Sequence, residues 1–143
     1  MKVIIGSDHA GFSLKQQVNS LLEEMGHTVE DVGCHGEDSV DYPVYGKAVA
    51  KGVASGQFPK GILICGSGLG MSMVANRFTG VRAALCNDLF SAILSRRHND
   101  ANLLVLGARL IGIDLAGEIV KAWFQTEFDG GRHLRRVAQL DEA

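Results

Sequence analysis

The chain has 143 residues, of which 46% are hydrophobic and 21% charged, as expected for a globular protein with one hydrophobic core. The formal net charge of -2 gives no reason to expect nucleic acid or an anionic membrane as a partner. Three cysteines without C-x-x-C spacing argue against a disulfide framework and a structural zinc site. The sequence shows no leader at the N-terminus, and no apolar run approaches the length of about 18 residues that a membrane span needs. Together with the unpaired cysteines, these observations predict a cytoplasmic protein.

In the first half of the chain, short apolar runs alternate with segments that have helical spacing. Leu14, Val18 and Leu22 repeat on one helical face behind the first apolar run, and Gly26 ends that pattern. Asp41 is expected to cap the next helix. The elements predicted in this half are strand 3–5, helix 14–25, strand 28–32 and helix 42–53.

The second half continues the alternation with three further apolar runs. The elements predicted there are strand 62–65, helix 71–78, strand 81–86, helix 88–97, strand 103–106 and helix 113–128. Five strands that alternate with helices predict an α/β fold, with a Rossmann-like five-stranded parallel sheet. We expect one three-layer α/β/α domain over residues 1–143, with a C-terminal helix and a basic tail.

A glycine-rich loop that follows Cys65 is the most informative local feature, and its residues are Gly66, Ser67, Gly68, Leu69 and Gly70. A strand that turns into a helix through glycines directs several backbone N–H groups toward one point and can bind an anion there. Such a site favours the thiolate form of an adjacent cysteine. The loop therefore predicts a base or nucleophile beside an anion site. The alternative is a tight strand-to-helix turn with an inert buried cysteine.

Three known loop patterns fit this segment poorly. The dinucleotide fingerprint G-x-G-x-x-G needs a third glycine where Met71 stands, although Asp88 lies at a plausible distance for a ribose contact. The nucleotide P-loop needs a lysine, and none occurs between Lys60 and Lys121. A cysteine-phosphatase loop needs an arginine six residues after the cysteine, again at Met71. The dinucleotide hypothesis is weakened and the other two are excluded.

Polar side chains follow several of the predicted strands. Asp8 and His9 come directly after the first strand, Tyr42 can approach through the loop after the second, and Arg109 follows the fifth. Ligands of open parallel sheets bind beyond the carboxyl ends of the strands. Each of these residues alone could be structural, but their convergence on the edge that holds Cys65 predicts a binding site.

His98 and Asn99 precede the fifth strand and should lie at the opposite edge of the sheet from Cys65. Either they cap the preceding helix or they complete the site of a neighbouring subunit. The basic tail leaves the same two alternatives, because such runs are often solvated surface. Arg132 and Arg136 share a helical face, however, and could hold a phosphate together.

Five ordered motifs carry a family resemblance that covers essentially the whole chain. They are Ser7-Asp8-His9-Ala10-Gly11, Asp41-Tyr42-Pro43, the run from Cys65 to Ser72, the run from Arg96 to Asn102, and Gly130-Gly131-Arg132-His133. Together they resemble the type B ribose-5-phosphate isomerases, which are grouped with the allose- and galactose-6-phosphate isomerases. Many members have threonine where this chain has Ser67, and a second variety uses a glutamate in place of the cysteine.

The resemblance implies a metal-independent, cofactor-free aldose–ketose isomerase that acts on a sugar phosphate through an enediolate. It also implies a homodimer with shared active sites, with a tetramer as the alternative assembly. Cys65 is then the base, Ser67 relays a hydroxyl proton, and the backbone from Gly66 to Gly70 holds the enediolate oxygen. His98, from the partner subunit, opens the sugar ring. The implied binding residues are Asn99 and Asp8 for the sugar, Tyr42 at the sugar end, and His9, Arg109, Arg132 and Arg136 for the phosphate.

Two alternatives to ribose 5-phosphate isomerisation remain open at this point. Pentose and hexose phosphates differ by one carbon, so allose or galactose 6-phosphate could be the substrate. A non-catalytic sugar-phosphate-binding protein would keep the arginines but would not need Cys65 beside the glycine loop.

Overall fold

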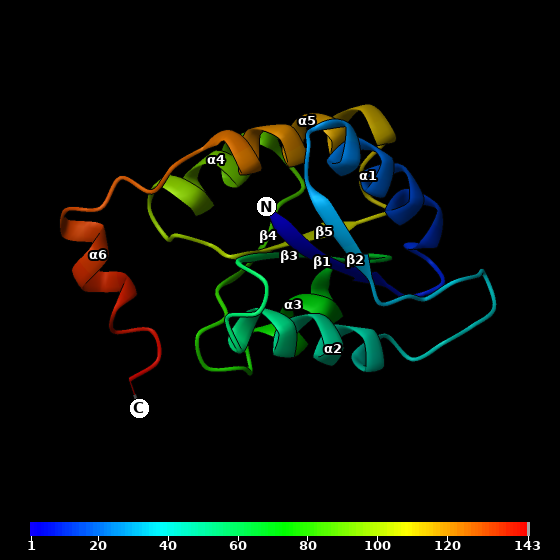
Figure 1. Cartoon of the computed structure of the whole chain (residues 1–143), viewed down its shortest axis with the longest axis horizontal. Helices are drawn as coiled ribbons and strands as arrows, with labels where there is room; N and C mark the ends of the chain where they lie inside the picture. Colours follow the sequence, from blue (N-terminus) through cyan, green and yellow to red (C-terminus); the bar gives the residue numbers. More distant parts are fainter. Residues whose placement is uncertain (143) are drawn as a thin grey trace.

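A parallel five-stranded sheet runs through the middle of the molecule (Figure 1), whose computed structural model describes residues 1–142. The strand order is β2-β1-β3-β5-β4, so β1, β3 and β5 each pair with a neighbouring strand on both sides. The strands are β1 (Lys2–Ser7), β2 (Thr28–Asp31), β3 (Lys60–Cys65), β4 (Ala83–Leu85) and β5 (Leu103–Gly107). The predicted α/β class with a five-stranded parallel sheet is confirmed.

Helices cover both faces of this sheet and make the three expected layers (Figure 1). On one face lie α1 (Phe12–Glu24), α4 (Leu89–Arg97) and α5 (Ile113–Gln125), and on the other lie α2 (Tyr42–Ala54) and α3 (Leu69–Ala75). The short α6 (Arg132–Val137) projects beyond the layers, at the left of Figure 1. Within residues 1–142, no helix is long and apolar enough to cross a membrane.

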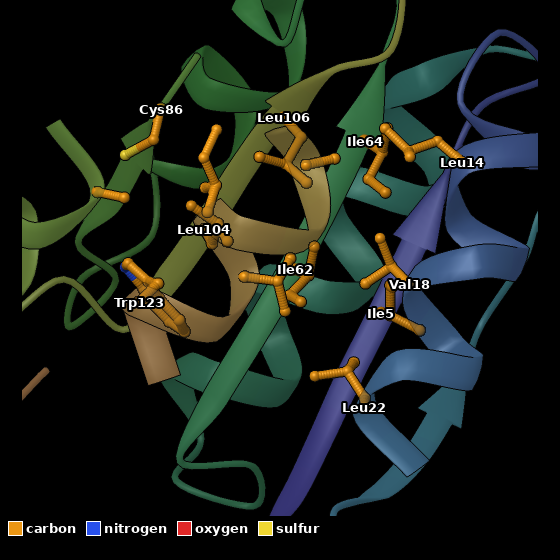
Figure 2. Close-up of a cluster of buried hydrophobic side chains, with 14 of the residues drawn as sticks. Ile5, Leu14, Val18, Leu22, Ile62, Ile64, Cys86, Leu104, Leu106 and Trp123 are labelled. Atoms are coloured by element: carbon orange, nitrogen blue, oxygen red, sulfur yellow. The ribbon is translucent and has the colours of Figure 1, made fainter. Parts of the chain in front are cut away.

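The core consists of one apolar layer on each face of the sheet. Alternate side chains of a strand point to opposite faces, and a parallel sheet buries both, which explains the continuous apolar runs of β3 and β5. Figure 2 shows Ile5 beside Val18 of α1, with Ile62 between them and Leu104, which lies near Trp123. Trp123 of α5 is completely buried in the same layer.

Several element ends differ from the predictions: α1 begins at Phe12 rather than 14, α3 ends at Ala75 rather than 78, and β4 spans Ala83–Leu85 rather than 81–86. Helix α3 begins at Leu69 rather than 71, because Gly68 has a φ of 80° and turns the chain into the helix inside the glycine loop. Helix α5 ends at Gln125 rather than 128, because Thr126 is extended (φ -94°, ψ 126°). Asp41 occupies the N-cap position of α2, but its side chain makes no capping hydrogen bond.

Two glycines let neighbouring loops pack directly against the end of β3. A Cβ atom at Gly11 would lie 2.6 Å from the carbonyl oxygen of Ile64, and one at Gly107 would lie 2.6 Å from that of Ser67. Real Cβ atoms do not approach backbone so closely. The loop after β1 and the end of β5 can therefore touch the Cys65 loop only without a side chain at these positions.

We predict that Gly11→Ala destabilises the protein by about 1–3 kcal/mol, because the added methyl group forces backbone apart. Gly36→Ala is the matched control, since a Cβ atom there meets nothing within 4 Å. The measurement is the free energy of unfolding in urea. Equal values for the two variants would show that the close approach is not needed.

Candidate active site

Cys65 is the last residue of β3 and is only 4% exposed. Its Sγ accepts a hydrogen bond from the backbone N–H of Gly68 at 3.2 Å. The left-handed conformation of Gly68 directs this N–H back toward the sulfur. The loop thus holds the sulfur in a defined position at the carboxyl edge of the sheet.

Backbone N–H groups gather beside this sulfur. Ser67 Oγ accepts the N–H of Leu69 at 3.2 Å, while Gly70 and Met71 belong to the first turn of α3, whose N–H groups have no partner inside the helix. The segment in which the sequence predicts an anion site therefore comprises the turn at 66–68 and the first turn of α3. It can hold an oxygen that becomes negative during a reaction.

The loop after β1 supplies a carboxylate and an imidazole. Asp8 is 7% exposed, its N–H donates to the Ile64 carbonyl at 3.2 Å, and its Oδ1 accepts the N–H of Gly11 at 3.1 Å. His9 Nδ1 accepts the N–H of Val40 at 3.2 Å. In the neutral ring, accepting this bond at Nδ1 puts the proton on Nε2.

Arg109 and Tyr42 flank the glycine loop. The N–H of Arg109 donates to the Gly66 carbonyl at 2.9 Å, and its side chain packs over Gly66, 3.3 Å from where a Cβ atom would stand. The Tyr42 ring covers Gly70 in the same way, since a Cβ atom at Gly70 would lie 2.6 Å from the ring carbons. The structure therefore gathers Asp8, His9, Tyr42, Cys65 with its loop, and Arg109 at one edge of the sheet.

The remaining predicted residues form a second group at the end of α4. His98 is the C-cap of α4, and its ring stacks on that of His133, with centroids 4.4 Å apart and planes at 9°. The two histidines line a cavity of about 290 Å³, which Asn99 and Arg136 also line. Arg132 begins α6, one residue before His133.

The two groups lie at opposite edges of the sheet, as expected. The N–H of Gly61, near the start of β3, donates to the carbonyl of Asn102, a few residues after His98. Cys65 instead pairs with Gly107 at the far end of the same strands. One chain therefore carries two partial groups and does not bring His98 to Cys65.

Sequence reasoning missed several polar residues. Ser7 is completely buried directly before Asp8, and among residues 1–142 its Oγ finds no hydrogen-bond partner. Its place in the first motif was the available signal. Asp129 and His133 lie against His98, and neither periodicity nor spacing in the sequence indicates this contact.

A partly buried ion pair, formed by Lys15 and Asp31, supports the loop that carries Asp8. Lys15 of α1 is completely buried, and its Nζ donates to Asp31 Oδ2 at 2.6 Å. Asp31 Oδ1 accepts the N–H of Gly33 at 2.9 Å, and the Gly33 carbonyl accepts the N–H of Ser7 at 2.7 Å. The pair thus fixes the segment against which Ser7 and Asp8 rest.

The fold defines a parallel α/β protein, and the residues around Cys65 form its candidate small-ligand site. The family model described as Ribose/Galactose Isomerase matches residues 3–140, and the chain belongs to this family. It is 47% identical to Ribose-5-phosphate isomerase B of Escherichia coli, covering 97% of this chain and 93% of that protein. A ribose 5-phosphate isomerase structure from Thermotoga maritima has 52% identity and a TM-score of 0.96, covering 99% and 98% of the two chains. D-erythrulose-4-phosphate isomerase of Pectobacterium atrosepticum is 39% identical, covering 98% and 93%.

The Lys15–Asp31 pair predicts a pH dependence of stability. Burial by itself would raise the pKa of Asp31, but hydrogen bonds from Lys15, Gly33 and Asn19 lower it below its ordinary value of 3.8. A lowered folded-state pKa means that the pair stabilises the protein fully above this value and loses its contribution as the pH falls through the folded pKa.

We expect Asp31→Asn to cost about 3–5 kcal/mol at pH 7, because it leaves the Lys15 charge buried and unpaired. The difference from the wild type should begin to shrink as the pH falls below 3.8, because the unfolded chain then binds a proton that folded Asp31 does not. Urea unfolding at pH 7 and at about pH 3 tests this sign. Asp38→Asn, at an exposed loop position, is the control, and a difference independent of pH would contradict the assignment.

Proposed function

We propose that this chain interconverts ribose 5-phosphate and ribulose 5-phosphate through an enediolate, with Cys65 as the base. The observation that carries the proposal is the fixed Cys65 sulfur at the head of a loop of backbone N–H groups. The E. coli relative and the T. maritima structure bear the name ribose-5-phosphate isomerase, which supports the choice of substrate.

In the forward direction, the Cys65 thiolate takes the proton from C2 of the open-chain aldose. The electron pair moves into a C1–C2 double bond, and the carbonyl oxygen O1 becomes the negative oxygen of the enediolate. The N–H groups of the glycine loop stabilise this charge. The Cys65 thiol then returns the proton to C1, while Ser67 Oγ relays the hydroxyl proton from O2 to O1, which leaves a ketone at C2.

Ring opening precedes this step, because ribose 5-phosphate is mostly a closed furanose. Breaking the bond between C1 and the ring oxygen requires a proton for that oxygen and removal of the proton on O1. We assign this exchange to the His98 imidazole, with Asn99 binding the sugar. Since His98 lies at the other edge of the sheet, it acts in the site of a partner subunit.

The remaining residues bind the ends of the substrate. Asp8 and Tyr42 hold sugar hydroxyls beside the glycine loop. The phosphate binds to His9, Arg109 and the partner's Arg132 and Arg136, whose guanidinium groups suit a dianion. With a separate phosphate site, the glycine loop is free for the enediolate.

The assembly that this site needs is a homodimer, with a tetramer as a larger alternative. Large apolar side chains are exposed on the helices beside the site: Met73 is 64% exposed and Phe90 66%. Exposed apolar surface of this kind favours association. No metal or cofactor takes part in the proposed proton transfers. The three free cysteines fit a cytoplasmic location.

The alternative substrates differ from ribose 5-phosphate in the length of the sugar. D-erythrulose-4-phosphate isomerase shares 39% identity with this chain, and the family description includes galactose. Allose 6-phosphate and galactose 6-phosphate are therefore the alternative substrates. A non-catalytic sugar-phosphate-binding protein is the alternative from a different class.

We predict that Cys65→Ala lowers turnover of ribose 5-phosphate by about 10²–10⁴-fold or more, because the proton acceptor is removed. Cys86→Ala is the control: burial raises the pKa of that thiol to about 11, and its turnover should be close to that of the wild type. Turnover of ribose, allose and galactose phosphates is measured side by side. Near-normal activity of Cys65→Ala would disprove the assignment of the base, and binding without turnover by the wild type would favour the non-catalytic alternative.

Mixing two inactive variants tests the shared site. Cys65→Ala and His98→Asn each damage one half, so a mixed dimer has one intact site of two. Random exchange should restore about a quarter of wild-type activity, given a site shared between two-fold related subunits. Verified exchange without recovery would rule out the shared site.

A further inference from the structure

His98, Asp129 and His133 form a group that the proposed reaction does not explain. Their ligand atoms, one from each side chain, all lie within 4.8 Å of one another. In residues 1–142, this is the one set of three or more such side chains close enough to share a metal ion. Two imidazoles and a carboxylate are a common donor set for Zn²⁺, with the fourth position left to water.

The chain builds this group from two segments that are fastened together. The N–H of Asp129 donates to the carbonyl of Arg97 at 3.0 Å, so the loop is tied to the end of α4, next to His98. Gly130 and Gly131 then take positive φ values of 67° and 58°. Because glycine adopts this conformation without strain, the chain can turn back and place His133 on His98.

The donor atoms lie near one another, but metal binding requires the histidine pair to unstack. Zn–N bonds of about 2.0–2.1 Å at tetrahedral angles put donor atoms about 3.4 Å apart. The rings of His98 and His133 are stacked with planes at 9° and centroids 4.4 Å apart. An imidazole nitrogen binds a metal through a lone pair in the ring plane, so two parallel rings cannot direct their lone pairs at one ion. At least one ring must rotate out of the stack for both to bind. Asp129 is exposed and both imidazoles are partly exposed, which allows such movements and leaves room for a water ligand.

Positive charge nearby limits the strength of the site. Arg97 Nε lies 3.2 Å from Asp129 Oδ2, and Arg132 and Arg136 stand on the same short helix as His133. A metal ion must compete with Arg97 for the carboxylate. We therefore expect reversible binding rather than a permanently held structural ion.

We propose that His98, Asp129 and His133 form a binding site for a divalent transition metal ion, with Zn²⁺ the best match, and that the bound ion inhibits the enzyme. A metal on the His98 ring occupies the nitrogen that would exchange protons with the sugar. The binding site stands on its own geometry, whereas the inhibition rests on the proposed role of His98 in ring opening. Inhibition should be strong with cyclic ribose 5-phosphate and weaker with open-chain ribulose 5-phosphate.

Binding is tested on the full chain without substrate, by calorimetric titration with Zn²⁺ and by the visible spectrum of Co²⁺. We expect one ion per chain, and at least tenfold weaker binding in His133→Gln and in Asp129→Asn. His35→Gln, at an exposed position elsewhere, is the control and should bind as the wild type does. Cys65→Ala should also keep the ion. Loss of the ion in Cys65→Ala, or unchanged binding in His133→Gln and Asp129→Asn, would overturn the site.

Inhibition is measured separately, with a chelator to reverse it. Because His133 stacks on His98, the rate of each protein with Zn²⁺ is compared with its own metal-free rate. This ratio should fall in the wild type and stay near one in His133→Gln. Equal inhibition of wild type and His133→Gln would overturn the proposed inhibitory effect. If Zn²⁺ binds at these three residues but the protein does not isomerise ribose 5-phosphate, the proposed function fails while the metal site stands.

Discussion

The close packing of backbone around the end of β3 is the constraint on which the rest of the structure depends. Gly11 and Gly107 allow the flanking segments to reach the carbonyls of Ile64 and Ser67, at distances that exclude any side chain. Gly68 adds the left-handed turn that returns its N–H to Cys65. A parallel sheet brings the ends of its strands to one edge. The glycines additionally let the loops that carry Asp8 and Arg109 pack directly against the Cys65 loop.

The ion pair between Lys15 and Asp31 is a second interaction that supports the site. The Lys15 ammonium is completely buried, and such a charge is tolerated only with a partner. Its partner Asp31 also binds the N–H of Gly33, whose carbonyl binds Ser7. The charge pair is therefore connected by two hydrogen bonds to the segment that leads into the Asp8 loop. Its contribution concerns geometry as much as stability, because a buried pair often contributes little to net stability.

The sequence was sufficient for the alternation of elements, the class of sheet and the residues at its carboxyl edge, because these follow from local periodicity and from the rule for ligand sites. The start of α3 required the φ value of Gly68, which composition alone does not specify. Lys15 stands within an amphipathic helix pattern, where a lysine is normally solvated, and its partner lies 16 residues away. Asp129 and His133 meet His98 only through a glycine turn and an anchored loop. Such long-range contacts have no signal in periodicity.

The division of the polar residues into two groups follows from the topology. A residue that ends a strand lies at the carboxyl edge, and a residue that ends the following helix returns to the amino edge. His98 ends α4 and therefore cannot reach Cys65 of its own chain, whatever its side-chain conformation. If ring opening and proton transfer use both residues, the complete site exists only between two chains, and association becomes a condition of activity. An ion held by His98, Asp129 and His133 would then act at the junction between subunits, where it removes one catalytic group and leaves the Cys65 loop of the same chain untouched.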